Sequence, residues 1–416
     1  MDKFIISGGK PLQGKISVSG SKNAVLPLMA ACLLTSDTCV LENVPEIRDV
    51  SAMAEIFEDL GVTVDYRGRT LTITAKDLSK HNPKPELVSK LRASILLLGG
   101  LLPRLKQVEL PYPGGDRIGR RPIDVHLQAL SVLGVKASVG QNIQVSCSEL
   151  VGGKIVLEES SVTATENAML AAVLAKGKTI IKLAAMEPHV QQLAEFLNSM
   201  GADISGLGSP TLEIEGATKL HGATVSVIPD SEEAASFITL AAATKSSLLI
   251  ENLNPDFLED YLLKIKNMKV NFEVGESFVK VLPPTEPYVG TKIQCGLYPK
   301  LNSDYLPPLA VLATQAAGET LMYEWLYENR LGYVPELQKM GGNLEILDPH
   351  RLKIQGPAKL YGQKITSYDL RMGITLVIAA LVAEGQTEIA EIGHVDRGYE
   401  HLEQRLQAVG ANIKRI

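Results

Sequence analysis

One acidic residue stands among glycines and arginines in the segment PYPGGDRIGRR, residues 111–121. Asp116 is its only carboxylate, and Arg117, Arg120 and Arg121 follow it. Glycines let a loop approach a ligand closely, and arginine binds phosphate through two parallel hydrogen bonds. The composition therefore predicts a phosphate-binding loop with one proton donor. The alternative interpretation is a solvated surface turn.

The elements that must position this loop come from an internal repeat, because the chain contains six units of similar length. Each unit opens with a short strand and an apolar helix rich in Ala and Leu, and then has an amphipathic helix that ends in a glycine-type turn. Successive turn residues lie 67 to 73 positions apart; they are Gly61, Gly134, Gly201, Lys269, Gly341 and Gly410. Within a unit we expect the order strand, helix, strand, helix, strand, strand.

The first unit illustrates the expected bounds. Its pattern predicts strands at 15–19, 39–42, 63–66 and 70–74, and helices at 24–34 and 50–60. The last unit stops at ANIKRI before its final strand, and FIISGGKPLQGKISVSG repeats the missing pattern, so residues 1–20 are expected to complete it. Two domains of three units follow, 21–228 and 229–416 with 1–20. The chain would cross between them twice, which predicts a ligand-binding cleft at their junction.

The bulk composition narrows the class of protein. The 416 residues are 45% hydrophobic and 21% charged, which is typical of a soluble globular chain. We expect neither a membrane span nor a secretory signal. The four cysteines show no Cys-x-x-Cys spacing and fit a reducing cytoplasm. The net charge of −6 argues against nucleic-acid binding, so an anionic ligand needs a local cluster of cations.

Six motifs occur in a fixed order: SKNAVLP, LRAS, PGGxxIGxRPxDxH, YENR, DLR and HVDRGYE. Together with the six units, they make the chain resemble the enolpyruvyl transferases from end to end. The resemblance implies an α/β fold, a two-domain inside-out α/β barrel (α/β prism) built from six βαβαββ repeats, three per domain. The buried first helices of the repeat fit this fold.

The resemblance also implies an activity. The enolpyruvyl group of phosphoenolpyruvate would be transferred to the 3′-hydroxyl of UDP-N-acetylglucosamine with release of phosphate, the first committed step of peptidoglycan biosynthesis. The 3-phosphoshikimate branch of the family typically carries Lys-Ser where this chain has Lys22-Asn23, which favours the sugar nucleotide. Addition followed by elimination needs cations, a general acid and a general base, but no metal or other cofactor. We expect a cytoplasmic monomer that acts on these two small molecules.

Site residues follow from the positions that match the family's motifs. The implied catalytic residues are Asp116, Asp304, Lys22 and Arg397. The implied ligands of phosphoenolpyruvate are Lys22, Asn23, Arg121 and Arg397. The implied ligands of UDP-N-acetylglucosamine are Asn23, Arg92, Arg121, Pro122, Ile123, Asp124, Val125, Asp304 and Leu326. The implied supporting charges are Arg330, Asp369 and Arg371.

Structural alternatives exist for several of these residues. Lys22 begins a helix, where free backbone N–H groups favour an anion, but it could also be a solvated lysine. Arg92 could be a surface salt-bridge partner. Asp304 would accept the 3′-hydroxyl proton, whereas Ser303-Asp304 could instead form a helix N-cap. Arg117 and Arg120 match no assigned position, and a solvated loop is their default.

The sequence also departs from the family pattern. Position 116 is commonly cysteine, the proton donor and the target of fosfomycin, although some members carry aspartate, so we expect Asp116 to be the donor and fosfomycin not to react. Further departures are Arg48, Glu159, Thr163 and Ser231. They leave open another acceptor, such as a nucleoside hydroxyl or shikimate 3-phosphate, or a paralogue that binds sugar nucleotides without turnover.

Overall fold

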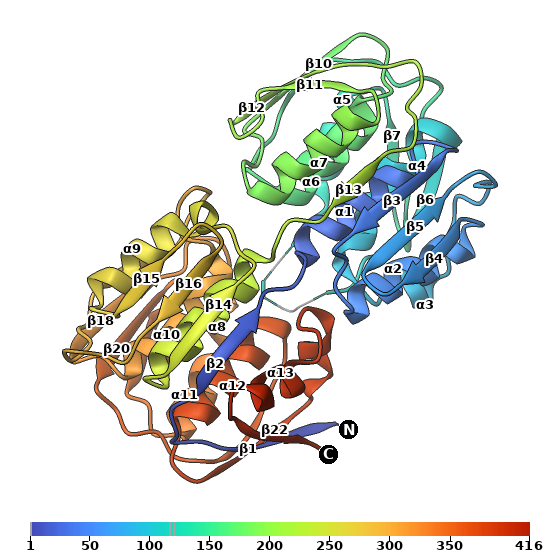
Figure 1. Cartoon of the computed structure of the whole chain (residues 1–416). Helices are drawn as coiled ribbons and strands as arrows, with labels where there is room; N and C mark the ends of the chain where they lie inside the picture. Colours follow the sequence, from blue (N-terminus) through green and yellow to red (C-terminus); the bar gives the residue numbers. More distant parts are fainter. Residues whose placement is uncertain (1, 116–117, 120) are drawn as a thin grey trace. The chain divides into compact units, whose positions relative to one another are not determined.

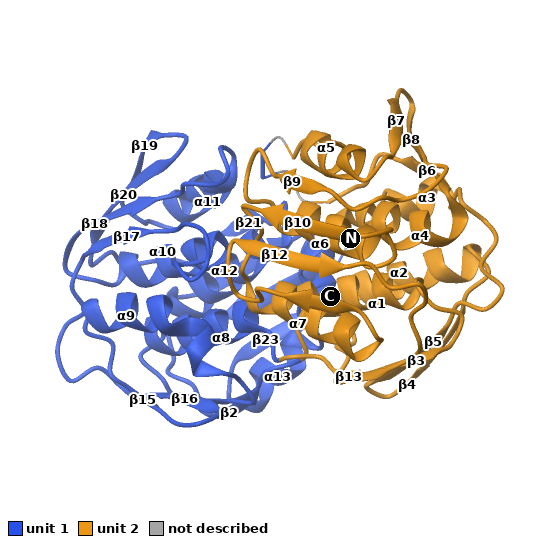
Figure 2. Ribbon diagram, turned by 90° about the horizontal axis from the view of Figure 1, so that it is seen from above, with its two compact units in different colours: residues 1–19, 116–120, 229–416 blue, residues 20–115, 121–228 orange. Residues whose placement is uncertain are grey.

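The polypeptide forms two units, each with its own core (Figures 1 and 2). This computed structural model describes residues 2–115, 118–119 and 121–416. Unit 1 comprises residues 1–19, 116–120 and 229–416, and unit 2 comprises 20–115 and 121–228. Asp116, Arg117 and Arg120 lie outside the described residues, so the structure does not place the predicted proton donor.

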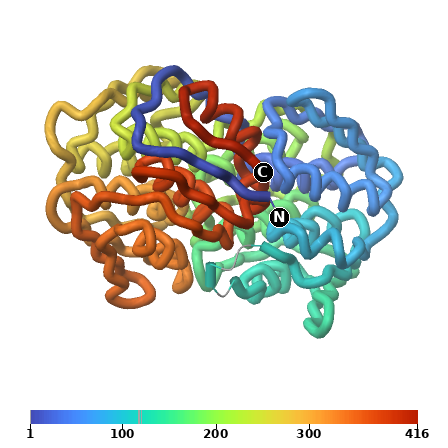
Figure 3. Tube along the Cα trace, turned by 90° about the horizontal axis from the view of Figure 1, so that it is seen from below, coloured from blue at the N-terminus to red at the C-terminus, as the bar shows by residue number. Residues whose placement is uncertain are grey.

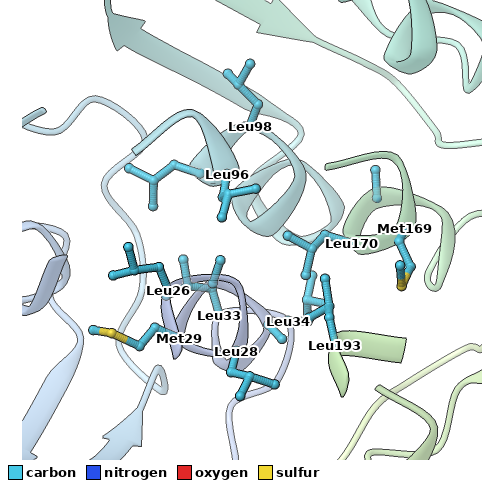
Figure 4. Close-up of a cluster of buried hydrophobic side chains, with 14 of the residues drawn as sticks. Leu26, Leu28, Met29, Leu33, Leu34, Leu96, Leu98, Met169, Leu170 and Leu193 are labelled. Carbon is cyan, nitrogen blue, oxygen red and sulfur yellow. The ribbon is translucent and has the colours of Figure 1, made fainter. Parts of the chain in front are cut away.

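Three apolar helices pack together in the centre of each unit. In unit 2 they are α1 (Lys22–Cys32), α4 (Leu97–Leu105) and α6 (Val162–Ala172). Figure 4 shows buried leucine and methionine side chains of this core, among them Leu28, Leu98 and Leu170. In unit 1 the central helices are α8 (Ser231–Ala243), α10 (Leu306–Thr314) and α12 (Leu370–Val382). These helices have no solvent-facing stripe, which confirms that the first helix of each repeat is buried.

A second set of helices is amphipathic. The members are α2 (Arg48–Asp59), α5 (Asp124–Val132), α7 (Pro188–Ser199), α9 (Glu259–Asn267), α11 (Val334–Lys339) and α13 (Leu402–Ala408). In α2, for example, Val50, Met53 and Phe57 are buried at helical spacing. The predicted turn residue after each of these helices has a positive φ, between 68° and 101°. Glycine adopts this left-handed conformation without strain, which explains five of the six residues.

In the described residues, the strands form six sheets, three in each unit. The orders in unit 2 are β13-β3-β5-β4, β6-β8-β7 and β11-β12-β10-β9. The orders in unit 1 are β15-β16-β14-β2, β17-β18-β20-β19 and β21-β22-β1-β23. In each four-stranded sheet one edge pair is parallel and the other pairs are antiparallel. Sheets and amphipathic helices therefore enclose each helical core, as the predicted α/β fold requires.

The elements predicted for the first unit form within two residues of the expected bounds; β2 (Gln13–Ser17) and α1 both begin and end two residues earlier than predicted. The unit 2 strands are β3 (Thr38–Glu42), β4 (Thr63–Arg67), β5 (Thr70–Thr74), β6 (Gln107–Pro111), β7 (Lys136–Val139), β8 (Asn142–Ser146), β9 (Lys154–Val156), β10 (Lys178–Lys182), β11 (Asp203–Ser205), β12 (Thr211–Glu215) and β13 (Thr224–Ser226). The unit 1 strands are β1 (Lys3–Ser7), β2 (Gln13–Ser17), β14 (Ser247–Glu251), β15 (Phe272–Val274), β16 (Phe278–Val281), β17 (Lys292–Gln294), β18 (Gly318–Tyr323), β19 (Leu344–Asp348), β20 (Arg351–Gly356), β21 (Lys364–Thr366), β22 (Gln386–Ala390) and β23 (Asn412–Arg415).

The opening strand predicted for the second unit is wrong. The segment folds instead into α3 (Pro85–Val88) and the 3-10 helix η1 (Arg92–Leu96), and its sheet has only three strands among the described residues. Pro85 occupies the first helical position, where proline is favoured because its missing N–H has no intrahelical partner. The other 3-10 helices are η2 (Pro255–Leu258), η3 (Ser303–Tyr305), η4 (Arg330–Tyr333) and η5 (Ile392–Arg397).

The first twenty residues contain two strands, β1 and β2, which belong to different sheets. Strand β1 pairs with both β22 and β23, so it completes the sixth sheet as predicted, and it brings the two chain ends together (Figure 3). Strand β2, however, pairs with β14, and β13 pairs with β3. The expectation that residues up to 20 all belong to the sixth repeat is therefore wrong for β2. Apart from the short segment around residues 118 and 119, the chain leaves unit 1 after Ser19 and returns at Pro229. Strand β2, before the first crossing, therefore joins a sheet of unit 1, and β13, before the return, joins a sheet of unit 2.

Candidate active site

Lys22 and Asn23 are the first two residues of α1, and Ser21 caps that helix by accepting a hydrogen bond from the Ala24 N–H. The Lys22 Nζ lies 3.1 Å from Asp49 Oδ2, and the exposed fractions of the two side chains are only 14% and 5%. The interpretation of Lys22 as a solvated lysine is therefore wrong. The pair holds a cation beside the free N–H groups of α1, a combination that favours an anion.

Arg92 holds the backbone of the loop that follows the glycine-rich segment. Its Nη2 donates hydrogen bonds to the carbonyl oxygens of Arg121 (2.7 Å) and Pro122 (3.4 Å). Gly115 lies against Arg92 with φ of +122°, and a Cβ there would lie 2.9 Å from the Arg92 Cβ. Glycine is required at this position, because it permits both the conformation and the close approach.

The segment at positions 121–125 leads directly into α5. Ile123 and Val125 are buried and anchor it, whereas Pro122 and Asp124 are exposed, and Arg121 is partly exposed. Asp124 is the first residue of α5, where a carboxylate compensates the positive end of the helix dipole. The structure therefore brings Arg92, Arg121 and Asp124 to one part of unit 2.

The glycine-rich segment continues beyond the undescribed residues. Residues 118 and 119 belong to unit 1, where the Ile118 carbonyl accepts a hydrogen bond of 3.1 Å from the Asn329 N–H. Asn329 belongs to the YENR motif, immediately before Arg330. Two of the quoted motifs are thus in direct contact.

A second charged group lies in unit 1 around Asp304. Its Oδ2 accepts a hydrogen bond of 2.6 Å from Arg371 Nε, and its Oδ1 pairs with Arg330 Nη2. Both guanidinium groups are buried, and they come from different elements, η4 and α12. The Asp304 carboxylate therefore lies against two guanidinium groups, which hold both of its oxygens in place.

The alternative role of Ser303-Asp304 as a helix N-cap is wrong. The cap of η3 is Asn302, whose Oδ1 accepts a hydrogen bond of 2.9 Å from the Asp304 N–H. Asn302 Nδ2 also donates to Glu232 Oε1. The Asp304 carboxylate is therefore committed to the two arginines and not to the local backbone.

Glu324 is a buried carboxylate that sequence inspection did not identify. It accepts hydrogen bonds from Ser303 Oγ at 2.6 Å, from the Leu326 N–H at 2.8 Å and from the Tyr327 N–H at 3.1 Å. It thereby connects the residue before Asp304 to the turn that contains Leu326. No local pattern marks Glu324, because its partner Ser303 lies 21 positions earlier.

The remaining predicted residues lie at helix ends in unit 1. Asp369 is the N-cap of α12, where it accepts a hydrogen bond of 2.8 Å from the Met372 N–H. Arg397 is the last residue of η5 and is partly buried. Asp396, next to it, forms two hydrogen bonds with Arg415 of β23, at 2.6 and 3.0 Å. The final strand thus fixes the position of the HVDR motif.

Buried charges near Asp304 shift several pKa values. Burial and the nearby Glu232 carboxylate raise the pKa of Asp230 to about 7, against the opposing charge of Arg371. Burial alone would lower the pKa of Arg371, but Tyr399, Glu232 and Asp230 raise it overall, so Arg371 stays charged. Burial also raises the pKa of Tyr399 to about 12, so its hydroxyl stays protonated. Arg371 therefore keeps its positive charge at physiological pH.

Membrane-spanning helices and clusters of metal ligands are both absent from the described part of the chain. There, no helix has the length and apolar composition needed to cross a bilayer. Among the same residues, no three His, Cys, Asp or Glu side chains are grouped so that they could hold a metal ion.

The chain is similar to known proteins over nearly its full length. Residues 6–406 match the family model described as EPSP synthase (3-phosphoshikimate 1-carboxyvinyltransferase). The UDP-N-acetylglucosamine 1-carboxyvinyltransferase of Halothermothrix orenii is 40% identical over 417 residues, 100% of each chain. The UDP-N-acetylglucosamine 1-carboxyvinyltransferase 2 of Listeria monocytogenes is 41% identical over 100% of this chain and 98% of its own.

Solved structures share the architecture. The enolpyruvyl transferase NikO from Streptomyces tendae superposes with a TM-score of 0.91 at 26% identity, covering 100% of this chain and 98% of its own. EPSP synthase from Acinetobacter baumannii superposes with a TM-score of 0.78 at 19% identity, covering 100% of each chain, a likeness that concerns the fold alone.

Proposed function

Since the chain belongs to the EPSP synthase (3-phosphoshikimate 1-carboxyvinyltransferase) family and is a 1-carboxyvinyl transferase, we propose that its acceptor is UDP-N-acetylglucosamine. It would transfer the enolpyruvyl group of phosphoenolpyruvate to the 3′-hydroxyl and release phosphate, the first committed step of peptidoglycan biosynthesis. One observation carries the choice of acceptor: relatives named for that reaction are about 40% identical to this chain from end to end.

The reaction consists of an addition and an elimination. A proton is added to the methylene carbon of phosphoenolpyruvate while the 3′-oxygen bonds to the neighbouring carbon and loses its own proton. The resulting tetrahedral adduct then loses a proton from the new methyl group, and the phosphate leaves with the electrons of its C–O bond. The protein must therefore supply an acid, a base and cations for the phosphate and the carboxylate.

Asp304 is proposed to accept the 3′-hydroxyl proton. Its pairing with Arg330 and Arg371 supports this role, because the two ion pairs fix the position of the carboxylate that would accept the proton. Two cations also weaken it as a base. The proton would therefore move late, when bonding of the 3′-oxygen to carbon has already made that proton acidic.

Lys22, Asn23, Arg121 and Arg397 are proposed to bind phosphoenolpyruvate. The pairing of Lys22 with Asp49 at the start of α1 supports the first assignment, because it fixes the ammonium group beside helix N–H groups. Arg121 suits a phosphate, since a guanidinium group forms two parallel hydrogen bonds with it.

The nucleotide would be contacted by Asn23, Arg92 and positions 121–125, and by Asp304 and Leu326. The Leu326 N–H already donates to Glu324, so a backbone contact at Leu326 would use the carbonyl oxygen. Arg330, Asp369 and Arg371 would support the site with their charges. Glu159, where the family commonly has lysine, is exposed and remains outside the proposed set.

Asp116 is proposed as the proton donor in place of the usual cysteine. An Asp116→Asn variant should then lose turnover, whereas Asp116→Cys should keep turnover and become sensitive to fosfomycin. The wild-type protein should show no mass increase after incubation with fosfomycin, because a carboxylic acid replaces the thiol. Unchanged activity of Asp116→Asn, or one bound drug molecule on the wild-type protein, would contradict this assignment.

The acceptor is tested by phosphate release from phosphoenolpyruvate with UDP-N-acetylglucosamine, shikimate 3-phosphate or UMP. We expect turnover with the sugar nucleotide. Turnover with only one of the other two acceptors would replace the proposed substrate, and no turnover with any of them would indicate a binding paralogue. We also propose that the protein works in the cytoplasm as a monomer; cell fractionation and sedimentation at assay concentrations test these two points.

A further inference from the structure

Three polar side chains form a network inside unit 2 that none of the proposed catalytic steps uses. His126 on α5 and Asn167 on α6 are buried, with exposed fractions of 2% and 0%. Asn167 Nδ2 lies 2.9 Å from His126 Nδ1, and Thr163 Oγ1 lies 3.2 Å from His126 Nε2. Both ring nitrogens of the imidazole therefore have a partner on α6, the helix against which α5 packs (Figure 1).

The hydrogen bonds of Asn167 determine the tautomer of His126. The Gly99 N–H donates to Asn167 Oδ1 at 2.7 Å, which fixes the orientation of the amide. Asn167 Nδ2 is then the donor, both to the Ile95 carbonyl at 3.0 Å and to His126 Nδ1. Because Nδ1 accepts this bond, the ring proton is on Nε2, which donates to Thr163 Oγ1.

The surroundings keep this imidazole neutral. Burial and the charges of Arg92 and Arg121 lower the pKa of His126 to about 3. A second ring proton on Nδ1 would also point at the N–H of the Asn167 amide. The donor and acceptor directions of the network are therefore constant over the physiological pH range.

The network joins the elements that carry the proposed nucleotide ligands. Ile95 belongs to η1, which begins with Arg92, and His126 follows positions 121–125 directly. Thr163 lies in the first turn of α6. The Arg92 side chain forms a separate bond to the Arg121 carbonyl. A shift of His126 would thus move the start of α5 relative to Arg92.

We propose that Thr163, His126 and Asn167 are positioning residues for the nucleotide of the acceptor, and that the Thr163 hydroxyl fixes the orientation of the imidazole. The proposal rests on UDP-N-acetylglucosamine being the acceptor. None of the three side chains needs to touch the substrate. They would act by holding Arg92 and positions 121–125 in one arrangement before the nucleotide arrives.

A Thr163→Val variant tests the proposal, because valine has a similar shape but no hydroxyl. It leaves the buried Nε2–H of His126 without an acceptor, and we expect the KM for UDP-N-acetylglucosamine to rise about five- to tenfold. The kcat and the KM for phosphoenolpyruvate should stay within about twofold of the wild type, because no group that meets the reacting atoms is changed. Thr163→Ser should restore the wild-type KM.

Thr179→Val is the matched control. Thr179 is a buried threonine of unit 2 whose Oγ1 has no hydrogen-bond partner among the described residues, so the same change removes no such bond. A KM for the nucleotide that is unchanged in Thr163→Val, or raised equally in both variants, would overturn the proposal. If Thr163→Val does not fold, Thr163→Ala removes the same hydroxyl at a smaller size and is judged by the same KM.

A second measurement is independent of turnover. The ¹⁵N shifts of the imidazole nitrogens of His126 should report a protonated Nε2 and an unprotonated Nδ1 between pH 5 and 8. The opposite tautomer, or a doubly protonated ring at pH 6, would overturn the network. Failure of the wild-type protein to use UDP-N-acetylglucosamine would instead overturn the proposed acceptor, and with it the nucleotide role, while the tautomer would stand.

Discussion

Asp304 is the residue whose substitution is expected to lower turnover most clearly. Its carboxylate pairs with Arg330 and Arg371, two arginines that are more than 25 positions away from it in the sequence. We expect Asp304→Asn to lower kcat by about 10²- to 10⁴-fold, the usual contribution of a general base. Steady-state phosphate release measures this loss, and circular dichroism must show that the variant is folded.

The matched control is Asp348→Asn. Asp348 also pairs with an arginine of unit 1, Arg351, at 2.5 Å, but both side chains are substantially exposed. Exposed pairs contribute little to stability, so this variant should keep the wild-type kcat. An Asp304→Asn variant with the activity of the control would remove Asp304 from the mechanism.

Asp230 predicts a pH dependence of stability. Its native pKa is raised to about 7 from an ordinary value of 3.8, by burial and by Glu232, so the native carboxyl keeps its proton where the unfolded one has lost it. The free energy of unfolding should therefore fall as pH rises from about 4 to 7, by at most about 1.4 kcal/mol per pH unit from this group. Asp230→Asn, which still caps α8, should gain stability relative to the wild type between pH 5 and pH 8 in urea unfolding. An equal difference at both pH values would contradict the assignment.

Among the elements, α12 allows two roles of one residue to be separated. Asp369 caps this helix, and it is also one of the proposed supporting charges. Asn caps a helix as well as Asp does, so Asp369→Asn should leave the thermal midpoint unchanged, whereas Asp369→Ala should cost about 1 kcal/mol. If the charge serves the reaction, kcat/KM should fall in both variants.

A variant that removes the N-cap of another helix serves as the control for the Asp369 variants. Asn254 caps η2 by accepting a hydrogen bond of 3.1 Å from the Asp256 N–H, and it belongs to no proposed site. Asn254→Ala should lower stability without lowering kcat/KM. A wild-type kcat/KM in Asp369→Asn would show that Asp369 is only a cap.

The sequence predicts elements better than it predicts partners. Turn residues such as Gly61 and Lys269 mark a local conformation, and both have a positive φ. Strand β2 has the same alternating pattern as other opening strands, but pairing with β14 connects positions over 230 residues apart, which no local pattern encodes. The helix α3 was missed because a strand was expected at the start of every repeat, although Pro85 favours a helix start.

The same limit applies to the candidate site. The motifs identify Lys22, which stands in SKNAVLP, and Arg371, which stands in DLR. They do not identify Asp49, Glu324 or Asn167, whose roles arise from contacts with distant residues. Buried polar groups need partners, so a buried Asn or Glu indicates that a partner exists but not which residue it is.

On the scale of the whole molecule, the last of the six repeats is completed by β1, a strand from the N-terminus of the chain. Strand β1 lies between β22 and β23, and the Lys3 N–H donates to the Ile416 carbonyl at 2.9 Å. The sixth repeat therefore depends on the first residues of the polypeptide. Deletion of residues 1–8 should expose the facing edges of β22 and β23 and destabilise unit 1.

The adjacent ends of the chain predict that a circular permutant will fold. A short glycine linker can join residue 416 to residue 1, and new ends can be placed at Gly140, an exposed residue in the turn between β7 and β8 where a side chain would meet nothing within 4 Å. Because β1 keeps both neighbours, we expect the permutant to keep kcat within about twofold of the wild type. The deletion of residues 1–8 serves as the control and should lose both stability and activity in the same assays. A permutant that fails to fold, or a truncated chain as stable as the full one, would show that the sixth sheet does not depend on β1 in this way.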